Sequence, residues 1–226
     1  MNTRSLASDG LLEGMVAQFC PSTSPRTQAA SAAKFRQLSR LLQEWSQRFN
    51  ITSIRDPQAI VVRHFVDSLL VLPLIPGSAG RIIDVGCGAG FPGLPVKICR
   101  PELEVAFLDS RQKALIFAKH AAATLGLKGV TFHHSRAEEA GKDPDLRERF
   151  DCAMAKALAR PKKVLDLCLP FVRGGGRLIA FLPSGGLGEE DRAWIEASGL
   201  HYWLEERSEE VFGWRRRFLV VEKGGK

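Results

Sequence analysis

The segment Asp84–Gly93 combines a carboxylate, closely spaced glycines and a proline directly after the apolar pair Ile82 and Ile83. Glycine allows tight backbone conformations and close approach of a ligand, and proline is well tolerated in the first turn of a helix. The order of these residue types predicts a buried strand, a glycine turn and a helix start. Such a turn is suited to binding a nucleotide-type cofactor, and a purely structural glycine turn is the alternative.

The spacing of the glycines favours one class of cofactor. A dinucleotide fingerprint that begins at Gly86 and Gly88 would need its third glycine at position 91, where this chain has Phe91. The pattern D-x-G-x-G-x-G is instead similar to motif I of S-adenosylmethionine-dependent methyltransferases. We therefore expect S-adenosylmethionine (AdoMet) rather than NAD at this turn.

A second carboxylate follows the next apolar run. Asp109 ends the segment Glu104–Asp109, 23 positions after Gly86, which is near the spacing at which an acidic residue binds the ribose hydroxyls of a nucleotide. Asp109 is also placed to be the N-cap of the following helix. The two roles are compatible, and the sequence favours the ligand role.

Two further segments lie after expected strands. The segment Ser135–Glu139 could contact an adenine edge, but Ser135 and Glu138 also fit a capping box, and the sequence leaves both open. Lys156 ends the apolar segment Phe150–Lys156. A lysine at that position of a central parallel strand is unusual unless it meets solvent or a ligand.

Other polar residues give weaker signals. His64 and Asp67 could share a helix face, although a lone histidine is more often a structural donor. His133 and His134 lack further ligands at metal-binding spacing, so no metal site is expected. No nucleophile elbow, phosphate loop or zinc-protease motif is present. We expect buried, unpaired thiols at the five cysteines, none of which forms a C-x-x-C pair: Cys20, Cys87, Cys99, Cys152 and Cys168.

The elements that position these residues follow from the apolar periodicity. Helices are expected over 27–48 and 57–72, the first with an apolar stripe from Phe35 to Phe49. Strands and helices then alternate, which favours a parallel sheet. The expected strands are 81–86, 104–109, 130–134, 150–156, 176–182, 201–207 and 216–222, and the helices between them begin near Pro92, Gln112, Arg136, Lys162 and Glu189. The predicted fold is α/β, a doubly wound Rossmann-like methyltransferase sheet of seven strands, the last antiparallel. It comprises an N-terminal helical cap (1–80) and an AdoMet-dependent methyltransferase domain (81–226).

Composition sets broad limits. The 226 residues are 45% hydrophobic and 25% charged, which is ordinary for a globular protein. No apolar run approaches the roughly 20 residues that span a bilayer, so a cytoplasmic location without a membrane partner is expected. The net charge of +7 is compatible with a nucleic-acid partner without identifying one, and Arg215, Arg216 and Arg217 form its densest run.

With these residues in place, the chain resembles the bacterial small-subunit rRNA guanine-N7 methyltransferases, known as RsmG or glucose-inhibited division protein B. The resemblance covers about residues 35–182 and the last strand. It rests on the following segments: Trp45 with Asn50–Asp56, Arg63–Ser68, Asp84–Pro95, Arg100–Glu102, Leu108–Ser110, Ser135–Glu139 and Phe150–Asp151. The pairing of R-H-x-x-D-S with G-x-G-x-P-G-x-P is more specific than the glycine turn alone.

The resemblance implies AdoMet as cofactor and a set of residues that bind it: Gly86, Phe91, Asp109, Ser110, Arg111, Ala137, Glu138 and Lys156. Two segments depart from the family pattern. Ala155-Lys156-Ala157 replaces Ser-Arg-Ala, which keeps a charge but loses a planar bidentate donor. Phe181–Gly186 lacks the lysine that commonly follows strand five.

The reaction implied by the resemblance is methyl transfer from AdoMet to N7 of a guanine in the 530 loop of 16S rRNA, at position 527. N7 already has a free lone pair, so no general base and no catalytic residue is expected, and positioning would supply the acceleration. The partner would be 16S rRNA or a small-subunit particle, and the protein a monomer without metal. The alternatives are a non-catalytic RNA-binding protein with the same fold and a small-molecule methyltransferase.

Overall fold

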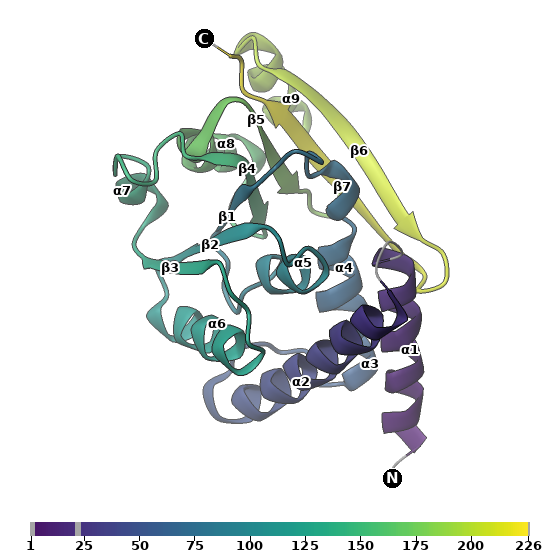
Figure 1. Cartoon of the computed structure of the whole chain (residues 1–226). Helices are drawn as coiled ribbons and strands as arrows, with labels where there is room; N and C mark the ends of the chain where they lie inside the picture. Colours follow the sequence, from purple (N-terminus) through teal and green to yellow (C-terminus); the bar gives the residue numbers. More distant parts are fainter. Residues whose placement is uncertain (1–2, 21–23, 226) are drawn as a thin grey trace.

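A computed structural model describes residues 3–20 and 24–225, with side chains from Gly10 onward. At its centre is one seven-stranded sheet in the order β3-β2-β1-β4-β5-β7-β6 (Figure 1). The strands are β1 (Arg81–Val85), β2 (Glu104–Asp109), β3 (Val130–His134), β4 (Phe150–Lys156), β5 (Val172–Phe181), β6 (His201–Glu209) and β7 (Trp214–Glu222). The first five pair in parallel, and β7 pairs antiparallel with both β5 and β6. The predicted doubly wound α/β fold is confirmed.

Helices cover both faces of the sheet (Figure 1). Side chains from β1, β2, β4, β5 and β7 alternate between two separate cores, as expected when successive residues of a strand point to opposite faces. One core includes residues of the N-terminal helices together with α5 (Gly93–Cys99) and α6 (Gln112–Thr124). The other includes residues of α7 (Ala137–Ala140), α8 (Pro161–Cys168), the 3-10 turn η3 (Leu169–Phe171) and α9 (Glu189–Ala197).

The N-terminal cap begins with two helices, α1 (Thr3–Phe19) and α2 (Pro25–Phe49). Ser24 caps α2 by accepting a hydrogen bond from the backbone N–H of Thr27 at 3.3 Å, and Asn50 ends it at φ 51°. Most of the predicted stripe of α2 is buried, but Phe49 is exposed. The sequence did not predict α1, whose Leu12, Met15 and Val16 pack into the same core.

The second predicted helix of the cap is not a regular α-helix. It runs from α3 (Pro57–Ile60) through the π-helix η1 (Val61–Val66) into α4 (Asp67–Leu69) and the 3-10 turn η2 (Leu72–Leu74). Pro57–Leu74 has a mean hydropathy of 1.2 over 18 residues and could cross a membrane by length and composition alone. However, 56% of this segment is buried in the fold, as in the core helix of a globular protein.

The expected strands agree with the structure to within two residues at most ends. The exception is β5, which begins at Val172 rather than at 176. Three consecutive glycines, Gly174–Gly176, hide its start because glycine is uncommon in strand interiors. A shift of register between Phe150 and Cys152 allows β4 to stay paired with this segment.

Candidate functional site

The glycine turn lies at the carboxyl end of β1, where strand order reverses between β1 and β4. The backbone N–H of Gly86 donates to the carbonyl of Leu108 at 2.7 Å, which joins the turn to β2. Gly86 and Gly88 have φ of 69° and 54°, in the left-handed region that favours glycine. The turn therefore has the conformation that its glycines predict.

Asp109 holds this turn through its carboxylate. Its Oδ2 accepts from the backbone N–H of Gly88 at 2.7 Å, and its Oδ1 accepts from the backbone N–H of Arg111 at 2.7 Å. The helix α6 begins at Gln112 with Arg111 at its N-cap position, so the N-cap role considered for Asp109 is wrong. The Arg111 guanidinium also donates to this carboxylate, from Nε to Oδ1 at 3.3 Å and from Nη2 to Oδ2 at 3.5 Å. These four contacts occupy the roughly four acceptor positions of a carboxylate, so a bound hydroxyl group would take the place of the longer guanidinium contacts.

A cavity of about 400 Å³, the glycine-loop cavity, lies beside this turn. Six of the eight residues expected to bind the cofactor line it: Gly86, Asp109, Ser110, Arg111, Ala137 and Glu138. They come from the ends of β1 and β2 and from the start of α7, three points that the sheet topology brings together. The remaining lining residues are Leu108, Ser135, Arg136, Ala157, Leu158 and Leu167.

The other two expected cofactor residues, Phe91 and Lys156, do not line the glycine-loop cavity. The Phe91 ring stacks on His64, with 4.8 Å between ring centroids, and is buried in the core beneath the cap. Lys156 turns toward the carboxylate of Asp67, because a buried ammonium requires a counter-charge. The structure thus places an aromatic packing residue and an ion-paired lysine where direct cofactor contacts were expected.

The capping box considered for Ser135 and Glu138 is not formed. The N-cap position of α7 is Arg136, which makes no side-chain cap bond, and Ser135 Oγ donates to the carbonyl of Arg136 at 3.2 Å. Glu138 pairs with Lys163 at 3.2 Å. Of the two roles left open by the sequence, capping is therefore wrong, and the segment lies on the wall of the cavity.

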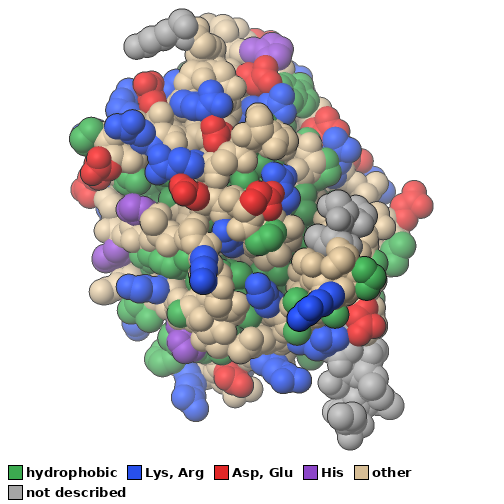
Figure 2. Space-filling view, in the orientation of Figure 1, with side chains coloured by type: hydrophobic (Ala, Val, Ile, Leu, Met, Phe, Trp, Pro, Cys, Tyr) green, Lys and Arg blue, Asp and Glu red, His purple; other side chains and the backbone are tan. Residues whose placement is uncertain are grey.

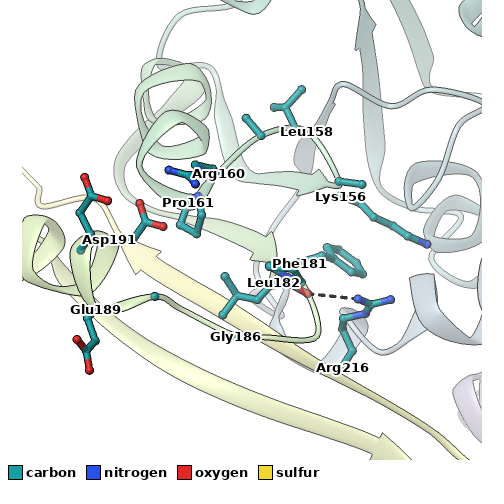
Figure 3. A pocket seen from close by; sticks show the side chains of 15 residues that line it. Lys156, Leu158, Arg160, Pro161, Phe181, Leu182, Gly186, Glu189, Asp191 and Arg216 are labelled. Atoms are coloured by element: carbon teal, nitrogen blue, oxygen red, sulfur yellow. Dashed lines mark hydrogen bonds between the residues drawn. The ribbon is translucent and has the colours of Figure 1, made fainter.

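A second and larger cavity of about 600 Å³, the β5 cavity, shares Ala157 and Leu158 with the first. Figure 3 shows side chains that line the β5 cavity. Lys156 and Arg216 lie on one side of it, and Glu189 and Asp191 lie on the other. Arg216 Nη1 donates to the carbonyl of Leu182 at 3.2 Å. The Arg216 guanidinium from β7 therefore lies next to the segment that follows β5. This is the segment in which the family that the chain resembles commonly has a lysine and this chain has none.

Leu158 lies between the two cavities and lines both. Its side chain packs directly on Gly86, so closely that a Cβ at Gly86 would overlap Leu158 Cδ1. The preceding residue, Ala157, has φ 53°, a conformation uncommon for alanine that directs the chain over the glycine turn. Ala157 also lines both cavities, so their boundary consists of two apolar residues.

Asp67 binds two cations that the sequence alone did not bring together. Its carboxylate is 1% exposed and lies 2.6 Å from Lys156 Nζ and 2.7 Å from Arg216 Nη2. Trp214 Nε1 also donates to Asp67 Oδ1 at 2.7 Å. Burial by itself would raise the pKa of Asp67, but the Lys156 and Arg216 charges lower it, so the carboxylate is ionised. The only signal for this cluster in the sequence was an unexplained lysine at the end of a central strand.

His64, within the π-helix, and Asp67, directly after it, bind different partners. His64 Nε2 is 3.0 Å from Thr52 Oγ1, and the His64 ring stacks on Phe91. Burial, with the nearby charge of Lys156, lowers the pKa of His64 to about 4. These contacts are those of a hydrogen-bonded packing residue, the structural role that the sequence favoured for His64.

Asp84 is fully buried behind the glycine turn. Its Oδ2 accepts from the backbone N–H of Gly93 at 2.8 Å, whereas Oδ1 is buried without a hydrogen-bond partner among the described residues. Burial raises the pKa of Asp84 to about 7, although the Gly93 hydrogen bond opposes this rise. Its contact with Gly93 fixes the start of α5 relative to β1.

All five cysteines lie in the described part of the chain, where each is buried and none forms a disulfide. Burial raises the pKa of Cys152 to about 12 and that of Cys168 well above its usual range. Because the thiolate is the nucleophilic form, neither residue is suited to covalent catalysis.

The sequence matches the model of one protein family over residues 31–189, described as rRNA small subunit methyltransferase G. The chain belongs to this family. It is 46% identical to the ribosomal RNA small subunit methyltransferase G of Acetivibrio thermocellus over 65% of this chain and 61% of that protein. The corresponding protein of Moorella thermoacetica is 42% identical over 79% of this chain and 75% of that protein.

Solved structures agree with the Rossmann-like methyltransferase fold of this family. The O-methyltransferase TomG from Streptomyces achromogenes, in complex with SAM, has a TM-score of 0.58 and 14% sequence identity, covering 85% of this chain and 90% of that chain. The YcgJ protein of Bacillus subtilis has a TM-score of 0.51 and 15% identity, covering 72% of this chain and all of that chain. At these identities the likeness concerns the fold alone.

Proposed function

We propose that this member of the methyltransferase G family transfers a methyl group from AdoMet to N7 of a guanine in the 530 loop of 16S rRNA, at position 527, in the cytoplasm. The observation that carries this proposal is the pair of adjoining cavities at the carboxyl edge of the sheet. The glycine-loop cavity suits the methyl donor, and the β5 cavity suits the acceptor base. Leu158 lies at the boundary that the methyl group would cross.

The glycine-loop cavity has the properties that AdoMet requires. Its volume of about 400 Å³ lies within the range of roughly 300–1,000 Å³ typical of small-molecule sites. Gly86 leaves the wall without a side chain where the methionine part would approach, and Asp109 could bind ribose hydroxyls in place of its 3.3 and 3.5 Å contacts with the Arg111 guanidinium. Ser110, Arg111, Ala137 and Glu138 complete the wall and would contact the remainder of the cofactor. Phe91 and Lys156 do not line this cavity, so we propose no direct contact between either residue and the cofactor.

The chemistry needs positioning rather than proton transfer. AdoMet supplies, when bound, a methyl group on a positively charged sulfonium sulfur. Guanine N7 carries a free lone pair, so no group on the protein must remove a proton before attack. Holding the base in line with the methyl group and excluding water would provide the acceleration. The lowered pKa of His64 and the raised pKa values of Cys152 and Cys168 agree with this mechanism, because none of the three residues is suited to act as base or nucleophile.

The acceptor side favours RNA over a small uncharged molecule. Lys156, Arg160 and Arg216 line the β5 cavity together with the carboxylates of Glu189, Glu190 and Asp191, and on its β7 side Arg215 and Arg217 add two further cations. On the face shown in Figure 2, basic and acidic side chains are interspersed, so the net charge of +7 does not mark that face as an RNA surface. The argument for RNA therefore rests on the cations at the β7 side of the β5 cavity.

Incubation with methyl-labelled AdoMet and either naked 16S rRNA or 30S particles tests the proposal. We expect label in 7-methylguanine in one of the two substrates. AdoMet binding without transfer to either substrate would contradict the proposal and favour transfer to a small molecule. Absence of AdoMet binding in calorimetry would favour a non-catalytic RNA-binding protein, an alternative motivated by the two departures from the family pattern.

A further inference from the structure

The cluster around Asp67 joins three parts of the chain that are distant in sequence. Asp67 begins α4 in the helical cap, Lys156 ends β4, and Trp214 and Arg216 lie in β7. The carboxylate contacts the two cations at 2.6 and 2.7 Å and is almost completely buried. Removing one partner from a buried charge cluster is costly because another charge is left without compensation. The positions of Lys156 and Arg216 therefore depend on Asp67.

The charge of the cluster is not balanced. The Asp67 carboxylate contacts an ammonium and a guanidinium, so these contacts alone leave one positive charge in excess. The buried Asp84 carboxyl also acts on Lys156, but it lies behind the glycine turn and does not line the β5 cavity. Lys156 and Arg216 both lie on the same side of the β5 cavity (Figure 3), and Arg216 also lines a cavity of about 380 Å³ together with Arg215 and Arg217. The surplus charge thus lies where two cavities adjoin, on the side proposed for the acceptor.

Each arginine in the run Arg215–Arg217 has its own environment because residues alternate between the faces of β7. The side chain of Arg216 is 22% exposed and binds Asp67, whereas that of Arg215 is 77% exposed. Arg217 pairs with Glu206 on β6 at 2.7 Å. Only the middle arginine is fixed from the protein interior.

We infer that Asp67 is a positioning residue for the acceptor RNA, holding Lys156 and Arg216 as a rigid cationic wall where the target nucleotide and its phosphate enter. This inference rests on the proposed function. The helical cap then contributes to recognition of RNA through one carboxylate, while the glycine-loop cavity is formed by other residues. Loss of the Asp67 charge should weaken use of RNA and leave the binding of AdoMet intact.

The test compares Asp67→Asn with Asp151→Asn. Asp151 lies at the opposite end of β4, where it pairs with Arg173 at 2.6 Å and accepts from two backbone N–H groups, so it is a matched carboxylate remote from both cavities. With 16S rRNA or 30S particles as substrate, we expect Asp67→Asn to raise the KM for RNA at least tenfold. The AdoMet Kd should stay within twofold. Asp151→Asn should leave both values within twofold even where it lowers the Tm.

A second set of variants tests whether Asp67 affects the KM for RNA through Lys156. Lys156→Met should raise the RNA KM several-fold, Lys156→Arg should restore it, and the double variant Asp67→Asn/Lys156→Met should fall short of the product of the two single effects. The two single variants at Lys156 still test the inference if Asp67→Asn does not fold. Rescue by arginine would not be expected if Lys156 contributed only to packing.

Two outcomes would overturn the inference: an unchanged RNA KM in folded Asp67→Asn and in Lys156→Met, or an equal change in Asp67→Asn and Asp151→Asn. Filter binding of naked 16S rRNA separates this result from failure of the proposed function. If the wild-type protein binds the RNA but transfers no methyl group, the proposed function fails. The inference would still be judged by the RNA Kd, which Asp67→Asn should raise at least fivefold.

Discussion

Leu158 packs its side chain on Gly86, so the apolar wall between the two cavities and the glycine turn are in direct contact. Gly86 therefore has two reasons to lack a side chain, namely its φ of 69° and the space that Leu158 fills. Any side chain there would displace Leu158 or project toward the space assigned to the cofactor.

Gly86→Asp should abolish AdoMet binding, raising the Kd at least 100-fold in calorimetry, which corresponds to about 3 kcal/mol. The added carboxylate would enter the region that the methionine part of AdoMet must approach. Gly199→Asp is the matched control because Gly199 also has φ 69°, but a Cβ added to it would meet no atom within 4 Å. That variant bears the same backbone strain and should bind AdoMet within twofold of the wild type. Equal loss of binding in both variants would attribute the effect to strain alone.

Asp84→Asn should change how stability depends on pH. Because the folded pKa of Asp84 is about 7 and the ordinary value is 3.8, the folded state retains a proton that the unfolded state has lost between these values. Asp84 therefore favours the folded state below about pH 4, and this contribution is lost as pH rises toward 7, by up to about 4 kcal/mol. Denaturant unfolding at pH 5, 6 and 7.5 should show the variant gaining stability relative to wild type as pH rises. A constant difference in stability between the variant and wild type across this pH range would contradict the raised pKa of Asp84.

His64→Gln should also change how stability depends on pH, but in the opposite direction to Asp84→Asn. The pKa of His64 is lowered from 6.5 to about 4, so its contribution is present above pH 6.5 and is lost as pH falls toward 4. Replacing His64 should therefore remove part of the acid destabilisation seen in unfolding curves. Because His64 is not expected to transfer protons, methyl transfer at pH 7.5 should stay within about threefold of wild type. A loss of 100-fold or more in kcat, with the fold retained, would instead assign His64 a catalytic role.

Arg215→Gln should weaken RNA binding through electrostatics. The side chain of Arg215 is 77% exposed beside the acceptor region and can reach a phosphate. Replacing one phosphate contact should reduce the slope of log K against log salt by about one. Arg149→Gln is the control because Arg149 precedes β4 at the opposite edge of the sheet. Equal slopes for both variants and wild type would place Arg215 outside the RNA interface.

Much of the fold was predictable from local patterns. The glycine turn, the alternation of apolar runs and the polar residues at strand ends are encoded within short windows, and the parallel topology then places those ends at one edge. Six of the eight expected cofactor residues consequently line one cavity. The start of β5 and the π-helix at Val61–Val66 were missed because glycines and a regular apolar pattern conceal such irregularities.

The sequence by itself determined the strand, turn and helix order, the cofactor class that it favours, and the resemblance to one family of methyltransferases. Only the tertiary structure decided the partners of Lys156, His64 and Phe91, and the different roles of the three consecutive arginines. The physical reason is that a buried charge must find an opposite charge in space, and Asp67 lies 89 positions before Lys156 and 149 before Arg216. No local pattern contains that pairing, whereas packing of the cap on the sheet brings all three side chains together.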